Sequence, residues 1–140
     1  MSAEVFLDTN VLVYAYDQSE PAKQARARQL IKSVSPVVST QVLGEFHVAV
    51  TRKLRQPLAC DVAAAVVRDV TLEHVVSLDA ALVNAAVATS IRYQLSYWDS
   101  LIIEAAVRAG CSQLYSEDLS DGAEYHGVTV RNPFADQGTR

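Results

Sequence analysis

The sequence predicts one α/β domain in which a mostly parallel sheet of about five strands lies between two layers of helices. Length supports this, because a chain of 140 residues buries more than half of the surface that it exposes when unfolded. Composition also supports it, because half of the residues are apolar and a fifth are charged, as in ordinary globular domains. Finally, short apolar segments alternate with helical ones, and strand-helix-strand units place consecutive strands in parallel.

The strands are predicted from apolar segments that polar residues bound. The first ends at Leu7, directly before Asp8, and the fourth is followed by an acidic turn that begins at Glu117. The expected strands cover residues 3–7, 36–39, 74–78, 113–116 and 128–130.

The helices are predicted from apolar spacing and from the residues at their ends. Pro21 suits a first helical position, Asp79 suits the N-cap of an Ala-rich helix, and Gly110 suits the position after a helix end. The expected helices cover 20–33, 40 to the stop at Gln56-Pro57, 61–70, 80–92 and 96–109. No linker or repeat divides the chain, so 1–140 is expected to be a single domain with a polar tail at 135–140.

Charge is distributed unevenly along the chain. The net charge is −4, but residues 1–60 hold seven Lys and Arg against five Asp and Glu, whereas the rest hold five against eleven. The negative total argues against broad electrostatic adhesion to nucleic acid. Two basic segments, at 23–32 and 52–55, are either phosphate contacts or solvated helix faces.

The sequence carries no signal for export or membrane insertion. The N-terminus has no basic region before its apolar run, and no stretch approaches the roughly 20 apolar residues of a transmembrane helix. A cytoplasmic protein without membrane contact is expected. Cys60 and Cys111 are isolated and are expected to be buried free thiols rather than a zinc site or a disulfide. Tyr97 and Trp98 are expected to pack on the core, with base stacking as the alternative.

Four acidic residues are predicted to meet at one edge of the sheet. Asp8 and Asp118 follow strands, while Glu45 and Asp99 lie near the beginning of helices that follow strands or loops at the same edge. Neighbouring carboxylates raise one another's pKa and so favour a cation among them. Oxygen ligands without His or Cys suit Mg²⁺ or Mn²⁺, which can activate water for phosphodiester hydrolysis.

Each acid also has a purely structural interpretation. Asp8 could cap a short helix, and Ser96 with Asp99 satisfies a capping pattern. Asp118 and Asp121 could stabilise the bend at 120–122, and Glu45 could be a surface residue. Asp79, at the same kind of junction, is assigned to capping alone.

Four motifs in this order resemble those of the PIN-domain family, and most of all the VapC-type toxins of bacterial toxin–antitoxin pairs. They are VFLDTNVLVY at 5–14, QVLGEF at 41–46, YWDSLI at 97–102 and SEDLSDG at 116–122. The resemblance extends from about Ala3 to Phe134. It implies an α/β/α sandwich and a Mg²⁺- or Mn²⁺-dependent endoribonuclease that cuts RNA, restrains growth, is neutralised by a small cognate antitoxin and forms a homodimer.

The resemblance also implies roles for individual residues. Asp8 and Asp99 would be the principal metal ligands, and Glu45 and Asp118 would complete the acidic pocket. Asn10 and Ser116 would hydrogen-bond the site from a second shell. The last motif departs from the family pattern, because Glu117, Asp118 and Asp121 crowd together and Ser116 stands where Thr is frequent. Asp118 and Asp121 are therefore alternatives for the fourth acid, and the number of metals stays open.

Two other functions are considered. A stand-alone nuclease, or an inactive PIN-like module that only binds RNA or protein, would have the same fold. An aspartyl-phosphate domain would phosphorylate Asp8, but such sites use a lysine from the second half of the chain, and the only lysines are Lys23, Lys32 and Lys53.

Overall fold

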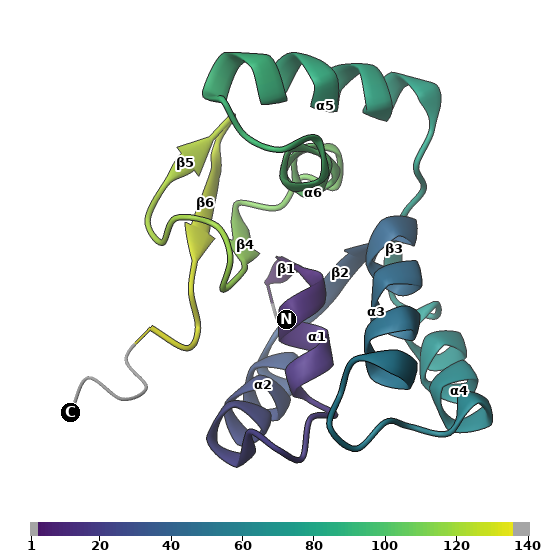
Figure 1. Cartoon of the computed structure of the whole chain (residues 1–140). Helices are drawn as coiled ribbons and strands as arrows, with labels where there is room; N and C mark the ends of the chain where they lie inside the picture. The colour runs from purple at the N-terminus through teal and green to yellow at the C-terminus, as the bar shows by residue number, and fades with distance from the viewer. Residues whose placement is uncertain (1–2, 136–140) are drawn as a thin grey trace.

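The computed structural model describes residues 3–135, which contain six strands and six helices (Figure 1). The expected tail at 135–140 lies outside the described residues apart from Ala135. In chain order the elements are β1 (Glu4–Leu7), α1 (Thr9–Tyr14), α2 (Pro21–Ser33), β2 (Ser35–Ser39), α3 (Thr40–Arg52), α4 (Cys60–Val70), β3 (His74–Val76), α5 (Ala80–Tyr93), α6 (Tyr97–Arg108), β4 (Gln113–Tyr115), β5 (Glu124–Tyr125) and β6 (Val128–Arg131).

The strands form one sheet in the order β3-β2-β1-β4-β6-β5. The five predicted strands are all present and pair in parallel, and only β5, which was not predicted, runs antiparallel to its neighbour β6. From β1 the chain adds β2 and β3 on one side, and then returns to add β4 on the other side. This reversal between β1 and β4 is where open α/β sheets bind ligands, at the carboxyl ends of the strands.

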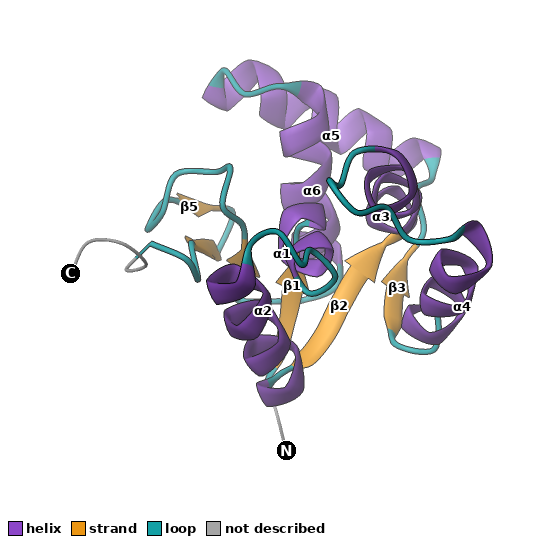
Figure 2. Cartoon of the chain, turned by 60° about the horizontal axis from the view of Figure 1, so that its bottom comes forward, coloured by secondary structure: helices purple, strands orange, loops and turns teal. Residues whose placement is uncertain are grey.

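The sheet lies between two layers of helices, as predicted. Because crossovers between parallel strands are right-handed, the steps from β1 to β3 place α1–α4 on one face and the return step places α5 and α6 on the other. Accordingly α2 and α3 pack on β2, whereas α6 packs across β2, β4 and β6 (Figures 1 and 2). Val5, Phe6 and Leu7 are all buried, since both faces of β1 are covered.

Several helix ends follow the predicted chemistry and one does not. Asp79 caps α5 by accepting a 2.9 Å hydrogen bond from the Leu82 amide. Gly110 follows α6 with a φ of 77°, which a residue without Cβ adopts readily. Helix α3 ends at Arg52, ahead of the predicted stop, because the chain turns back and Leu58 donates its amide to the Val50 carbonyl.

Three other differences concern side chains and a short helix. Cys111 is buried, but Cys60 at the beginning of α4 is exposed, so the burial predicted for Cys60 is wrong. Tyr97 packs on the core, whereas Trp98 is 60% exposed and does not. Residues 9–14, which were not among the predicted helices although Asp8 was considered as the cap of a short one, form α1. None of the helices in the described residues is long and apolar enough to cross a membrane.

Candidate active site

Asp8 lies where β1 ends, and its carboxylate is held from two directions. Its amide donates to the carbonyl of Tyr115 at the end of β4, at 2.9 Å. Its Oδ1 accepts a 2.7 Å hydrogen bond from the amide of Thr9, and its Oδ2 accepts one of 2.7 Å from Ser116 Oγ. Only 6% of the residue is exposed. Asp8 is therefore a buried acid at the switch point of the sheet, where the strand order reverses between β1 and β4. It is also the N-cap of α1.

Ser116 is the matching residue after β4. Its hydroxyl is fully buried, donates to Asp8, and accepts hydrogen bonds from the amides of Asp118 (3.2 Å) and Leu119 (3.3 Å). A hydroxyl has one proton and two lone pairs, so all three positions are occupied. Ser116 thus couples the orientation of Asp8 to the turn that carries Asp118.

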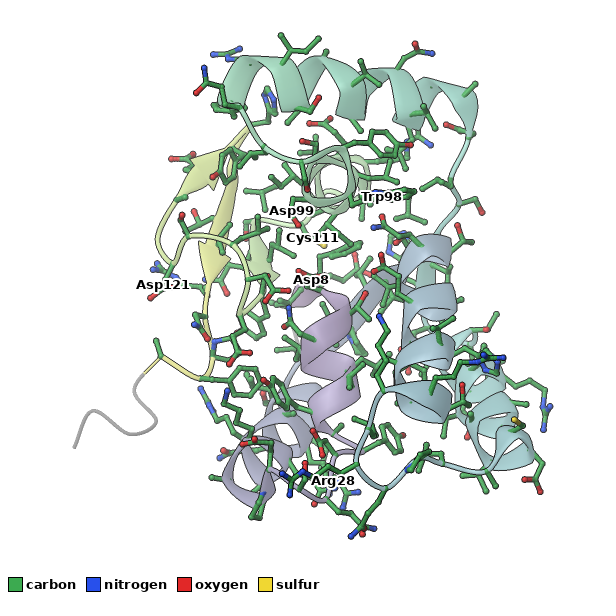
Figure 3. The ribbon with its side chains drawn as sticks, viewed as in Figure 1. Asp8, Arg28, Trp98, Asp99, Cys111 and Asp121 are labelled. Carbon is green, nitrogen blue, oxygen red and sulfur yellow. The ribbon has the colours of Figure 1, made fainter. Side chains whose placement is uncertain are left out.

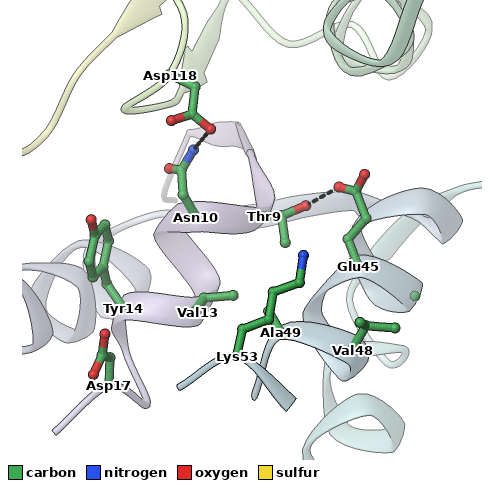
Figure 4. Close-up of a pocket in the computed structure, with 11 residues that line it drawn as sticks. Thr9, Asn10, Val13, Tyr14, Asp17, Glu45, Val48, Ala49, Lys53 and Asp118 are labelled. Carbon is green, nitrogen blue, oxygen red and sulfur yellow. Dashed lines mark hydrogen bonds between the residues drawn. The ribbon is translucent and has the colours of Figure 1, made fainter. Parts of the chain in front are cut away.

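Asn10 makes a second connection between α1 and this turn. Its Nδ2 donates to Asp118 Oδ2 at 3.0 Å, and its Oδ1 accepts from the amide of Glu117 at 3.1 Å. The two bonds give the side-chain amide one possible orientation. Asp118 is thereby held beside the first turn of α1 (Figure 4).

Glu45 reaches the same region from α3. Thr9 Oγ1 donates to Glu45 Oε1 at 2.6 Å (Figure 4). Gln41 Nε2 donates to Glu45 Oε2 at 3.2 Å. Thr9 and Gln41 belong to the sequence motifs, yet neither was assigned a role, because their contacts depend on how α1 and α3 pack together.

The electrostatics of Asp8 reflect this arrangement. Burial raises the pKa of its carboxyl group to about 6, against the opposing effect of hydrogen bonds from Ser116 and Thr9. The negative charges of Asp118 and Glu45 add to the increase. Asp8 forms no ion pair within residues 3–135. Two neighbouring carboxylates therefore act on Asp8, and within residues 3–135 no basic side chain pairs with it.

Asp99 lies in the first turn of α6. Its amide donates to Ser96 Oγ at 3.0 Å, so Ser96 is the N-cap that the capping pattern predicts. In residues 3–135 the Asp99 carboxylate has no hydrogen bond or ion pair, and Figure 3 places it at the beginning of α6, above Asp8. Nowhere in the described ranges do three Asp, Glu, His or Cys side chains converge as closely as metal ligands do. By chemistry the donors fit a hard cation, although they are not gathered around one point.

Asp121 is placed differently from the other acids. Its Oδ1 accepts a 2.9 Å hydrogen bond from the amide of Asn132, which follows β6, and it lies at the outer edge of the molecule in Figure 3. Glu45 and Asp118 thus lie close enough to Asp8 to raise its pKa, without converging on one point. Within residues 3–135 Asp99 has no hydrogen bond to these acids, and Asp121 is in a loop contact.

A pocket of about 860 Å³ opens beside the acids, between α1 and α3 (Figure 4). Its residues are Thr9, Asn10, Val13, Tyr14, Asp17, Gly44, Glu45, Val48, Ala49, Lys53 and Asp118. Glu45 and Asp118 lie at one end with their hydrogen-bonding partners, whereas Asp17 lies away from them beside Tyr14 (Figure 4). Aliphatic side chains line the wall. Lys53 is the only basic residue of this lining, and its ammonium group points toward Thr9 and Glu45 (Figure 4).

A second group of residues holds the turn that carries Asp118. Glu117 accepts 2.6 Å hydrogen bonds from Tyr14 Oη and from Lys23 Nζ, and Lys23 lies 4.8 Å from the centre of the Tyr14 ring. Burial tends to raise the pKa of Glu117, but the bonds from Lys23 and Tyr14 outweigh it and lower that pKa. The hydrogen bond to Glu117 raises the pKa of Lys23. In the sequence only the crowding of acids at 117–121 indicated this group.

The fold and the acidic pocket at the switch point together define a PIN domain. The PIN domain family model matches residues 5–120, so the chain belongs to the PIN domain family. Comparison with curated protein sequences gives no significant match.

Solved structures extend this result at the level of the fold. A toxin–antitoxin complex from Klebsiella pneumoniae is similar with a TM-score of 0.69 and 18% identity, over 92% of this chain and 97% of that one. The sarcin-ricin loop cleaving toxin VapC20 of Mycobacterium tuberculosis is similar with a TM-score of 0.66 and 20% identity, over 81% of this chain and 89% of that one. VapBC2 of Rickettsia felis, bound to DNA from its promoter, is similar with a TM-score of 0.62 and 16% identity, over 92% of this chain and 98% of that one. The VapC-type resemblance of the sequence motifs thus agrees with the fold.

Proposed function

We propose that this PIN-domain protein is a divalent-metal-dependent endoribonuclease and the toxin of a toxin–antitoxin pair. The observation that carries the proposal is the buried Asp8 carboxylate, which Asp118 and Glu45 influence electrostatically and which no basic side chain of residues 3–135 neutralises. Such a cluster is costly unless a cation joins it. Membership of the PIN family favours this chemistry over an aspartyl-phosphate enzyme.

The residues that would hold Mg²⁺ or Mn²⁺ are Asp8, Asp99 and Asp118, with Glu45 as the fourth acid of the pocket. The metal would supply an activated water and would stabilise negative charge on the phosphate oxygens. Ser116 and the Thr9 amide orient the Asp8 carboxylate, because they occupy its two oxygens separately.

Asp118 is preferred to Asp121 as the acid of the last motif. Asn10 Nδ2 holds Asp118 at the pocket, whereas Asp121 is occupied by the amide of Asn132. A carboxylate that is already held by a hydrogen bond needs less rearrangement to become a metal ligand. This preorganisation favours metal binding by Asp118.

The test is cleavage of RNA by purified protein with added Mg²⁺, with Mn²⁺ and with EDTA. We expect cleavage only with a metal, loss of cleavage in Asp8→Asn and Asp99→Asn, and a strong decrease in Asp118→Asn. Asp79→Asn is the matched control, because Asp79 also follows a strand but caps α5 and pairs with Arg108. Asp121→Asn should also remain active. If the pocket variants cleave as the parent does, the activity belongs to a contaminant and the proposal fails.

The toxin role rests on the fold shared with structures described as toxin–antitoxin complexes. We expect that production of the chain in the cytoplasm arrests growth, and that a small protein encoded beside it relieves the arrest by binding. We also expect a homodimer in light scattering. Metal-dependent cleavage without growth arrest would indicate a stand-alone nuclease, and RNA binding without cleavage would indicate an inactive PIN-like module.

A further inference from the structure

We propose that the pocket between α1 and α3 binds the nucleotide next to the scissile bond, with Lys53 on its phosphate and its base against the aliphatic wall. The inference rests on the proposed function, because it assigns a subsite to the same RNA substrate. It concerns residues outside the acidic cluster, and so it can be tested separately.

The shape of the pocket provides the first argument. Its volume of about 860 Å³ lies within the range of roughly 300–1,000 Å³ that small-molecule sites occupy. It begins at the acidic end with Asn10 and Asp118 and continues between the two helices to Lys53 (Figure 4). A strand whose scissile phosphate lies at the acids therefore has room for one more nucleotide beside it.

The charge of Lys53 provides the second argument. Lys53 is the C-cap of α3, and in residues 3–135 it forms no ion pair, nor do the neighbouring Arg52 and Arg55. Its ammonium group points into the pocket, toward Thr9 and Glu45 (Figure 4). An unpaired ammonium group beside a hydrolytic site is suited to a phosphate, which it binds as a point charge.

The apolar wall provides the third argument. Val13, Val48 and Ala49 line the pocket on either side of Lys53, farther from the acidic end than its ammonium group (Figure 4). Val48 is 45% exposed, so a planar base that covers it removes apolar surface from water. A nucleotide combines an anionic phosphate with a flat, weakly polar base, and this pocket offers a partner to each of them.

Binding is measured first, in an Asp8→Asn background, so that the RNA stays intact. The probe is a short fluorescein-labelled single-stranded RNA, and its anisotropy is followed over a series of salt concentrations. We expect Lys53→Gln to weaken binding roughly tenfold and to reduce the slope of log affinity against log salt by about 0.7. Lys53→Arg should keep most of the affinity. Lys32→Gln, which removes an equal charge from the exposed face of α2, should have little effect.

The wall is tested with a matched pair of valines. Val48 in the pocket and Val62 on α4 are 45% and 48% exposed, so neither substitution disturbs the core. We expect Val48→Asp to weaken RNA binding and to raise KM about tenfold with little change in kcat, because the pocket binds substrate and transition state alike. Val62→Asp should behave as the parent, and melting curves should show all variants folded.

The outcomes distinguish this proposal from the proposed function. If the parent cleaves RNA but Lys53→Gln and Val48→Asp bind and cleave as it does, the subsite is overturned while the nuclease assignment stands. If the parent does not cleave, yet these variants lose RNA binding, the subsite stands and the nuclease assignment fails. If both variants weaken only the complex with the protein encoded beside this chain, the pocket is a protein-docking site and the subsite is overturned.

Discussion

Ser116 Oγ donates a 2.7 Å hydrogen bond to Asp8 Oδ2, although 108 positions separate the two residues in the chain. The contact follows from the sheet, since β1 and β4 are parallel neighbours and Leu7 pairs with Tyr115. The residues that come next, Asp8 and Ser116, therefore lie side by side. The orientation of the Asp8 carboxylate thus depends on a hydroxyl that is distant in the sequence.

We predict that Ser116→Ala lowers both stability and cleavage. The substitution leaves the amides of Asp118 and Leu119 without their acceptor and Asp8 without a donor, and a lost partner of this kind costs about 1–3 kcal/mol. Urea denaturation measures the stability and RNA cleavage measures the activity.

The control for this variant is Ser100→Ala. Ser100 is equally buried, but its hydroxyl donates only to the Ser96 carbonyl within α6. We expect Ser100→Ala to be less destabilising and to cleave normally. Equal losses of cleavage in both variants would mean that Ser116 has no specific effect on the acids.

We predict that Asp8→Asn stabilises the metal-free protein at neutral and higher pH. In the folded protein the pKa of Asp8 is raised from 3.8 to about 6, so the folded state binds more protons between these values and stability falls as the pH rises through them. This loss amounts to about 3 kcal/mol at pH 8. The variant avoids it and should therefore be more stable than the parent at that pH, with the difference vanishing toward pH 4. Thermal unfolding in EDTA measures the effect.

Asp79→Asn should show the opposite sign. The hydrogen bond from Arg108, together with that from the Leu82 amide, lowers the pKa of Asp79. The stabilisation that the Asp79 carboxylate gives to the folded state is therefore present above the unfolded pKa and lost as the pH falls. The variant should melt lower than the parent at pH 8.

Added Mg²⁺ should raise the melting temperature of the parent but not that of Asp8→Asn. A parent that melts higher than Asp8→Asn at pH 8 in EDTA would contradict the prediction.

We predict that Lys23→Met lowers the kcat of RNA cleavage while the folding stability changes little. Lys23 and Tyr14 hold the Glu117 carboxylate, and Glu117 directly precedes Asp118. A small displacement of a catalytic group lowers the rate by about 10²-fold in unfavourable cases, so a decrease in kcat of about tenfold is expected. Arg108→Met, which breaks the exposed pair with Asp79, should leave kcat unchanged. Unchanged kcat in Lys23→Met would show that the turn is held without this ion pair.

We predict that the two thiols differ in reactivity. Burial raises the pKa of Cys111 to about 11, so little thiolate is present at pH 8 and the side chain is inaccessible, whereas Cys60 is exposed. The thiolate is the reactive species. Titration with a disulfide reagent should modify one thiol in the folded protein and two in urea, and Cys60→Ser should abolish the first. Rapid modification of both thiols in the folded protein would contradict the burial of Cys111.

The fold was predictable from the sequence where an element is long enough to show its periodicity. The five parallel strands and the helices α2 to α6 have this length, and Asp79 and Gly110 mark their ends. Helix α1 has six residues, too few to display an apolar stripe, and β5 has two residues that are a strand only because β6 pairs with them. Trp98 was misjudged, because the sequence does not reveal which face of a first helical turn meets the core.

The candidate site was predictable to a similar extent. Parallel topology alone places residues after β1 and β4 at one edge, so the positions of Asp8 and Asp118 follow from the sequence, whereas Ser116 was indicated only by the family resemblance. The choice between Asp118 and Asp121 depends on hydrogen bonds with Asn10 and Asn132, which only the packed chain defines. The direction of the Lys53 side chain is likewise a consequence of how α3 packs beside α1.

The position of β4 beside β1 has a consequence for biosynthesis. A growing chain displays Asp8 and Asn10 first, but Ser116 lies 108 positions after Asp8, so it leaves the ribosome several seconds later at about 5–20 residues per second. Until β4 inserts next to β1, the hydroxyl that orients Asp8 and the turn that carries Asp118 are not in place. Chains that terminate before β4 therefore cannot assemble the pocket, and the proposed nuclease becomes competent only after β4 and the turn that follows it have been made.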